Sequence, residues 1–124
     1  MEKKKEYHMR AVGSRTEELA AAFLERHNMV ILERNFRSRQ GEIDLIGLHN
    51  GYLVFIEVKS RFSLKKGSPE DAVNHGKQRT ICRVADYYRY LHKIPVSMPV
   101  RYDVVAIFKE EYRWYKNAFP HIYG

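Results

Sequence analysis

Hydrophobic positions along the chain first follow the period of a helix and then that of strands. After Ser14 the apolar residues recur at intervals of three and four, at Leu19, Ala20, Phe23 and Leu24, which is typical of one buried helix face. Ser14 and Glu17 have the spacing of a helix capping box. We therefore expect a helix that begins there and ends near residue 27 or 28. The β-branched and apolar start of 29–36 predicts the first strand.

Two strand-like runs follow, over 41–48 and 52–59, and Asn50-Gly51 lies between them. Asn-Gly is the preferred two-residue turn of a β-hairpin, because both positions require positive φ. Residues whose numbers sum to 101 would then lie opposite each other. The turn therefore predicts that Asp44 and Glu57 face each other across the hairpin, beside one face that is entirely apolar.

A second helix is indicated by Ser68-Pro69-Glu70-Asp71, which combines an N-cap serine, a proline at the first helical position and acids in the first turn. We expect an interruption near Gly76. Beyond it one face of the helix is formed by Gln78, Ile81, Ala85 and Tyr88. Pro95 and Pro99 end the helical pattern.

The last third of the chain predicts two strands. The unbroken apolar run at 104–108 favours a strand, 100–108, that is covered on both sheet faces. The alternating aromatic residues of 112–117 are typical of an edge strand. The order helix, three strands, helix and two strands indicates an α/β domain with a mixed five-stranded sheet flanked by helices.

Composition limits the class of protein. With 124 residues, 44% of them hydrophobic, we expect one domain over 13–124 behind a flexible basic arm, 1–12. The single cysteine, Cys82, excludes an internal disulfide and fits a reducing compartment. No run approaches the roughly 18 apolar residues that cross a bilayer, so we expect a cytoplasmic protein without a membrane partner. The net charge of +7 favours a polyanionic partner, of which nucleic acid is the first candidate.

The pair of Asp44 and Glu57 points to chemistry. Two opposed carboxylates have Cβ atoms about 5 Å apart, and they repel by roughly 3 kcal/mol at an effective dielectric near 20. Mg²⁺ reverses this interaction, because it binds one or two protein carboxylates and fills its other positions with water and phosphate oxygens. Lys59, two residues from Glu57 on the same face, is suited to stabilising phosphate charge or orienting water. The three side chains suffice for phosphodiester hydrolysis.

Each of these residues also has a purely structural interpretation. Asp44, Glu57 and Lys59 could form a surface ion-pair patch that binds no metal. Glu17 either caps its own helix or joins the metal ligands. Gln78 is either an amide at the rim of the core or a ligand of the scissile phosphate.

The other polar and aromatic residues are expected to have structural rather than catalytic functions. Asp103 lies in a strand that looks buried, and we expect it to pair with Arg101 or another basic residue rather than to take part in catalysis. The six histidines have no metal-ligand spacing. The aromatic residues of the last strand are expected to pack.

Basic residues follow the hairpin and continue into the second helix. They either surround the acids, where they would neutralise backbone phosphates, or belong to a solvated basic loop. The candidates for nucleic-acid contacts are Arg61, Lys65, Lys66, Lys77, Arg79 and Arg83.

The hairpin also carries a family resemblance. Gly41-Glu42-Ile43-Asp44-Leu45-Ile46, followed by Val54-Phe55-Ile56-Glu57-Val58-Lys59-Ser60-Arg61, resembles the YraN-type endonucleases of the PD-(D/E)XK superfamily, which are related to Holliday-junction resolvases. The resemblance extends from Gly13 to Phe119. The sequence departs from the superfamily name at Ile43, where a proline would stand.

The resemblance implies a restriction-endonuclease-like core. In such a core Asp44 and Glu57 would bind Mg²⁺ or Mn²⁺, and Lys59 would assist the attacking water. Glu17 would complete the metal site from the first helix, and Gln78 would be an auxiliary active-site residue.

Three functional hypotheses follow from the sequence. The first is a metal-dependent endonuclease that cuts DNA, with branched DNA of repair or recombination as its substrate. The second is a nucleic-acid-binding module of a repair complex without catalysis. The third is a metal phosphoesterase for small nucleotides. Symmetric cutting of a junction would require a homodimer.

Overall fold

The computed structural model describes residues 15–60 and 73–124. The described elements follow the predicted order: a helix over 15–26, β1 (Val30–Ser38), β2 (Gly41–His49), β3 (Tyr52–Lys59), α2 (His75–Leu91), β4 (Val100–Phe108) and β5 (Glu111–Tyr115). The five strands form one sheet in the order β1-β2-β3-β4-β5. Only β3 and β4 are parallel. The α/β class and the mixed five-stranded sheet are thus confirmed.

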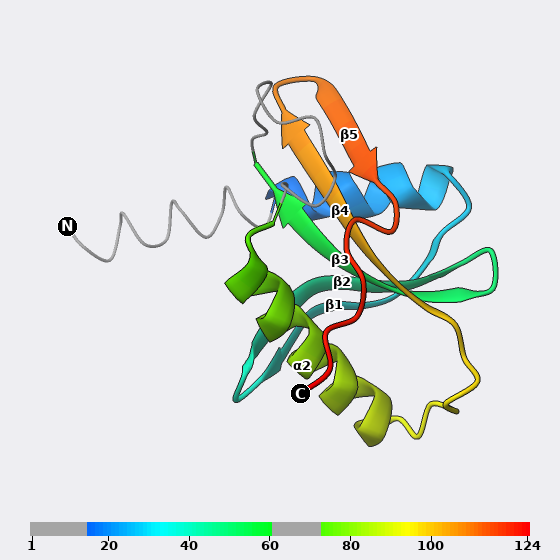
Figure 1. Cartoon of the computed structure of the whole chain (residues 1–124). Helices are drawn as coiled ribbons and strands as arrows, with labels where there is room; N and C mark the ends of the chain where they lie inside the picture. The colour runs from blue at the N-terminus through cyan, green and yellow to red at the C-terminus, as the bar shows by residue number, and fades with distance from the viewer. Residues whose placement is uncertain (1–14, 61–72) are drawn as a thin grey trace.

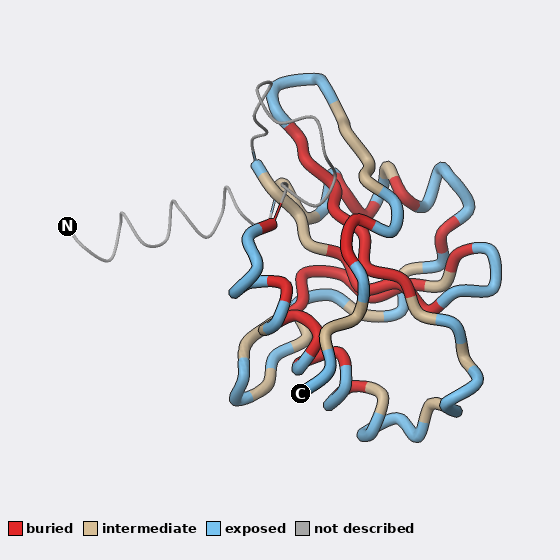
Figure 2. Tube along the Cα trace, viewed as in Figure 1, coloured by how far each residue is buried: buried red, intermediate tan, exposed pale blue. Residues whose placement is uncertain are grey.

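The sheet is covered on both faces, with α2 on one side and helix 15–26 on the other (Figure 1). Each helix has its own core cluster. Ile81 and Ala85 of α2 pack with Phe55, whereas Leu24 of the first helix packs with Leu45 and Ile56. Buried residues therefore concentrate in the central strands (Figure 2).

Local signals explain the element boundaries. Asn50 and Gly51 have φ values of 51° and 83°, which is the turn conformation that Asn-Gly favours. The side chain of Asn74 accepts a hydrogen bond of 2.9 Å from the backbone N–H of Lys77 and so caps α2.

The start of α2 differs from the sequence-based expectation. Residues 73 and 74 are not helical, so α2 begins at His75, and Gly76 lies inside it without a break. The predicted N-cap at Ser68 lies outside the described residues, as do the expected basic arm 1–12 and the capping residue Ser14.

The two faces of the β2–β3 hairpin also differ from the sequence-based expectation at one residue. Leu45 and Ile56 share one face, under helix 15–26, but Ile43, which was expected on that same face, packs on the α2 side, so strict alternation fails near Asp44. In β1, Asn35 has a φ of 53° and lies between the residues that pair with Leu45 and Ile43. The register of β1 and β2 is the same on both sides of Asn35 and shifts between Ile31 and Glu33.

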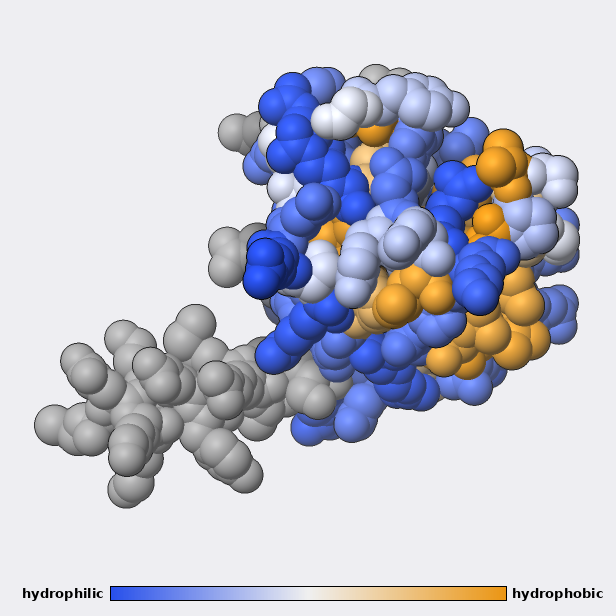
Figure 3. Space-filling model, turned by 90° about the horizontal axis from the view of Figure 1, so that it is seen from below, coloured by the Kyte–Doolittle hydropathy of each residue, from blue (hydrophilic) through white to orange (hydrophobic). Residues whose placement is uncertain are grey.

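The surface combines basic, polar and apolar areas. Seen from below, apolar residues gather on one part of the molecule beside a hydrophilic surface (Figure 3). Large hydrophobic side chains that remain exposed include Leu19, which was expected to be buried, and Val30, Leu32 and Val96. None of the helices in the described ranges combines the length and hydropathy that crossing a bilayer requires.

Candidate active site

The candidate site lies where the β2–β3 hairpin opens. Cross-strand pairing with numbers that sum to 101 runs from His49 and Tyr52 to Leu45 and Ile56, as predicted. The next pair would be Asp44 with Glu57, but the ladder ends one step earlier. Instead, the Asp44 carboxylate accepts a hydrogen bond of 2.8 Å from the backbone N–H of Val58.

Asp44 is buried, with 9% of its surface exposed. Burial raises its pKa above the ordinary value, and the charge of Glu42 acts in the same direction. The N–H of Val58 and the charge of Lys77 oppose the rise, because both stabilise the carboxylate. The structure therefore holds an acid where water cannot fully solvate its charge.

Glu57 is perturbed more strongly. Burial and then the charge of Asp44 raise the pKa of Glu57 to about 7, against the opposing charges of Lys77 and Lys59. Its Oε2 lies 4.0 Å from the Nζ atom of Lys77, at the start of α2. Asp44 is thus close enough to raise the pKa of Glu57, although the two are not a ladder pair.

Glu17 brings a third carboxyl from the first helix. Burial and the charge of Asp44 raise its pKa, and a hydrogen bond with the side chain of Asn35 lowers it. Its side chain also interacts directly with that of Asp44. These contacts direct Glu17 toward Asp44, whereas its capping alternative involves Ser14, which lies outside the described residues.

The remaining predicted site residues lie around this group. Lys59 is half-buried and close enough to Glu57 to lower its pKa. Gln78 is buried in the first turns of α2, and its Nε2 donates a 2.8 Å hydrogen bond to the carbonyl of Val73, a contact expected of an amide at the rim of the core.

The predicted nucleic-acid contacts are only partly within the described ranges. Lys77, Arg79 and Arg83 are placed on α2, and Lys77 faces the acids. Arg61, Lys65 and Lys66 lie outside the described residues.

Two members of the group were missed by sequence reasoning. Asn35 contacts Glu17 because of its left-handed conformation, and no spacing rule reveals such a residue inside a strand. Glu42 was expected opposite Lys59. It pairs with Arg37 in β1, at 3.2 Å, and its charge raises the pKa values of Asp44 and Glu57.

The donor set suits a hard divalent cation only if water and substrate complete the coordination. Within residues 15–60 and 73–124, no three Asp, Glu, His or Cys side chains form a ready metal-binding group. Mg²⁺ needs only one or two protein carboxylates when phosphate and water supply the rest. Asp44 and Glu57 could supply those carboxylates, because the charge of Asp44 reaches Glu57.

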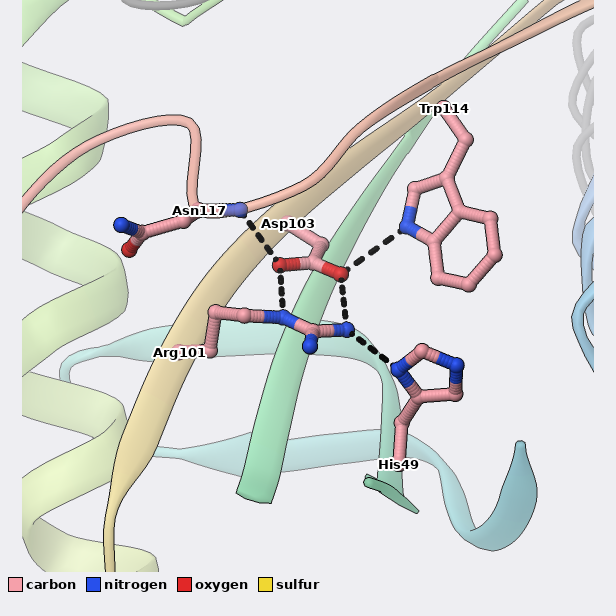
Figure 4. Close-up of polar contacts among 5 residues, drawn as sticks. All are labelled: His49, Arg101, Asp103, Trp114 and Asn117. Carbon is pink, nitrogen blue, oxygen red and sulfur yellow. Dashed lines mark hydrogen bonds and ion pairs between the residues drawn. The ribbon is translucent and has the colours of Figure 1, made fainter. Parts of the chain in front are cut away.

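A second buried acid has a different function. Asp103, 1% exposed, accepts two 2.9 Å hydrogen bonds from the guanidinium of Arg101 and one each from Trp114 Nε1 and the backbone N–H of Asn117 (Figure 4). Arg101 also donates to His49 Nδ1 at 2.9 Å. The expected pairing of Asp103 with Arg101 is confirmed, and the network ties β4 to β5 and to the end of β2.

Comparison with known proteins gives consistent matches. A family model described as "Uncharacterised protein family UPF0102" matches residues 16–107. A UPF0102 protein of Lachnoclostridium phytofermentans is 49% identical over 107 residues, which cover 86% of this chain and 91% of the relative. A relative from Clostridium perfringens is 39% identical over 116 residues, covering 89% and 94%, and one from Persephonella marina is 40% identical over 107 residues, covering 86% and 91%.

Proposed function

The chain belongs to the UPF0102 family, and from the carboxyl groups of Asp44, Glu57 and Glu17, together with the nuclease-like sequence of its hairpin, we propose that it is a divalent-metal-dependent endonuclease acting on DNA. The proposal includes membership of the PD-(D/E)XK superfamily. One observation carries it: the buried carboxylate of Asp44, held by the N–H of Val58, lies beside Glu17 of the first helix and close enough to Glu57 of β3 to raise its pKa. Such an arrangement costs stability unless a cation joins it.

The surroundings of the acids support phosphodiester hydrolysis. Asp44 and Glu57 would hold Mg²⁺ or Mn²⁺, and Glu17 would assist from beside Asp44. When bound, the cation would polarise a phosphate oxygen and supply a more acidic water. The overall charge of +7 attracts the polyanionic substrate to an acid cluster that alone would repel it.

The lysines have separate tasks in this scheme. Lys59 stabilises negative charge that develops on the phosphate and orients the attacking water. Lys77, 4.0 Å from Glu57, favours the ionised form of that carboxyl and exchanges it for a phosphate oxygen when DNA arrives. Gln78 supports the beginning of α2 through its bond to Val73, so it positions Lys77.

Cleavage assays test the proposal. Purified protein is incubated with branched, flapped and linear DNA, and with matching RNA, in Mg²⁺ or Mn²⁺. We expect cleavage of DNA that falls at least 100-fold in Asp44→Asn and Lys59→Ala, whereas Glu25→Gln, which changes an exposed acid of the first helix, leaves it unchanged. Equal cleavage by all variants would identify a contaminating nuclease.

A nucleic-acid-binding protein without catalysis is the second candidate. It is favoured by the ion pair of Lys77 with Glu57 and by the lack of a ready three-ligand group among the described residues. It predicts salt-dependent DNA binding that divalent cations do not strengthen, and no cleavage of any substrate. Binding titrations with and without Mn²⁺ separate the two candidates.

A further inference from the structure

A cavity of about 400 Å³ lies beside the tip of the β1–β2 hairpin and α2. It is lined by Arg37, Ser38, Arg39, Gln40 and Tyr87. The two elements approach closely here, since a Cβ atom on Gly41 would lie 2.7 Å from a side-chain carbon of Thr80 and 3.6 Å from one of Val84. Packing between hairpin and helix therefore fixes the walls of the cavity.

The lining has the chemistry of a nucleotide site. Tyr87 is 44% exposed, and its ring lies 6.2 Å from that of Phe36, between centroids. One side of the ring is thus supported by the hairpin while the side chain still reaches the cavity. Arg39 is exposed, and so is the side chain of Arg37. An aromatic ring beside guanidinium groups is the combination that binds unstacked bases and their phosphates.

Glu42 connects the cavity to the acids. Its carboxylate lies 3.2 Å from Nε of Arg37, and in β2 it stands two residues before Asp44. The Arg37–Glu42 pair therefore connects the lining of the cavity to the strand that carries Asp44. The Arg37–Glu42 pair is exposed on both sides, at 78% and 44%, so it is weak enough for a phosphate to displace.

We propose that this cavity binds an unpaired nucleotide of the DNA within a few nucleotides of the cleaved phosphodiester, with the base stacked on Tyr87 and the flanking phosphates at Arg37 and Arg39. This inference rests on the proposed function and names its substrate class: DNA with unpaired nucleotides at the cleavage site, such as flaps and branches. A base inside a duplex must first leave its stack to enter a side cavity, which lowers its affinity.

Binding to labelled DNA without divalent cations tests the inference apart from catalysis. Fluorescence anisotropy compares a flapped DNA with an uninterrupted duplex of the same sequence. Wild type binds the flapped DNA more tightly. Tyr87→Ala weakens flap binding about tenfold and leaves duplex binding unchanged, and Tyr87→Phe retains the wild-type preference. A 2-aminopurine at the first unpaired position is quenched by wild type and by Tyr87→Phe, but not by Tyr87→Ala.

Matched variants separate the cavity from general surface effects. Tyr90→Ala removes a more exposed tyrosine of the same helix, 80% accessible, and leaves the flap preference unchanged. Arg39→Ala reduces the slope of the flap-binding constant against salt concentration by the amount that corresponds to about one phosphate contact. Arg26→Ala, on the other helix, does not change this slope.

The outcomes for this cavity and for the nuclease proposal are distinguishable. Equal flap preference in wild type and Tyr87→Ala overturns the cavity assignment, even if both proteins cleave DNA. Flap binding that depends on Tyr87, in a protein that cleaves no DNA with Mg²⁺ or Mn²⁺, supports the cavity and overturns the nuclease.

Discussion

Asp44 combines a structural and an electrostatic function in one carboxyl group. By accepting the N–H of Val58 it replaces a rung of the β2–β3 ladder, which satisfies a backbone donor that would otherwise lack a partner. The same group lies beside Glu17 and influences Glu57. A side chain that only accepts this hydrogen bond does not need a charge. We therefore relate the charge of Asp44 to the surrounding acids.

Glu57 makes the stability of the fold depend on pH. Its pKa is about 7 in the folded protein, against an ordinary 4.5. Below about pH 4.5 it is protonated in both states. Between pH 4.5 and 7 the folded state keeps a proton that the unfolded chain releases, so the free energy of unfolding falls as pH rises. Above pH 7 Glu57 is ionised in both states, and its buried charge lowers the free energy of unfolding by the full amount, on the order of 3 kcal/mol.

Glu57→Gln should therefore stabilise the metal-free protein at high pH. We expect wild type and variant to have similar free energies of unfolding at pH 5, and the variant to be more stable by about 1–3 kcal/mol at pH 8. Urea denaturation at both pH values measures this. Glu25→Gln, in an exposed ion pair with Arg34, should show no such trend. A pH-independent difference between Glu57→Gln and wild type would contradict a raised pKa.

At the scale of elements, local sequence patterns account for most of the fold. The bounds of β3 and β4 agree with the predicted 52–59 and 100–108, because alternation and an unbroken apolar run are strong local signals. The Asn-Gly turn sets the hairpin register as far as Leu45 and Ile56. That register leads to Asp44 and Glu57 at the same end of the hairpin, so their proximity could be predicted from the turn alone.

The rest depends on contacts that no local pattern encodes. The conformation of Asn35 and the departure of Ile43 from its expected face arise from the pairing of two strands. The choice of Glu17 between a helix cap and the acids depends on how the first helix docks on the sheet. Spacing within one element cannot decide either, since each is set by a partner on another element.

The junction of β4 and β5 provides a prediction for Asp103. Asp103→Ala leaves the buried guanidinium of Arg101 uncompensated and removes the acceptor of Trp114 Nε1. We expect a loss of about 3–5 kcal/mol in the free energy of unfolding, measured by urea denaturation. Glu111→Gln is the matched control in the same hairpin, because its 2.9 Å pair with Arg113 is exposed; it should cost less than about 1 kcal/mol. Comparable losses in both variants would contradict a structural network at Asp103.

For the whole molecule, the acid cluster is a product of assembly. The first helix supplies Glu17, the hairpin supplies Asp44 and Glu57, and α2 supplies Lys77. In Figure 1 the start of helix 15–26, the end of β3 and the start of α2 converge on the same side of the molecule. The two core clusters, one on each face of the sheet, hold these elements together. Their packing therefore offsets the repulsion among the acids.

A cation that relieves this repulsion should stabilise the whole fold. At ten times its dissociation constant, bound Mn²⁺ or Mg²⁺ adds about 1.4 kcal/mol, which for a domain of 124 residues raises Tm by about 3–6 °C. Thermal unfolding at pH 8 measures the shift. It should shrink at pH 5.5, where protons compete for Glu57.

Variants decide where that cation binds. Asp44→Asn retains a side-chain oxygen for the N–H of Val58 but loses the charge, so its Tm without metal should equal or exceed that of wild type and should not respond to Mn²⁺. Glu25→Gln should respond like wild type. An equal rise in Tm in Asp44→Asn would show that the ion binds elsewhere. If the Tm of wild type did not rise up to millimolar Mn²⁺, protonation and the charge of Lys77 would have to relieve the repulsion among the acids. The metal-dependent mechanism would then fail.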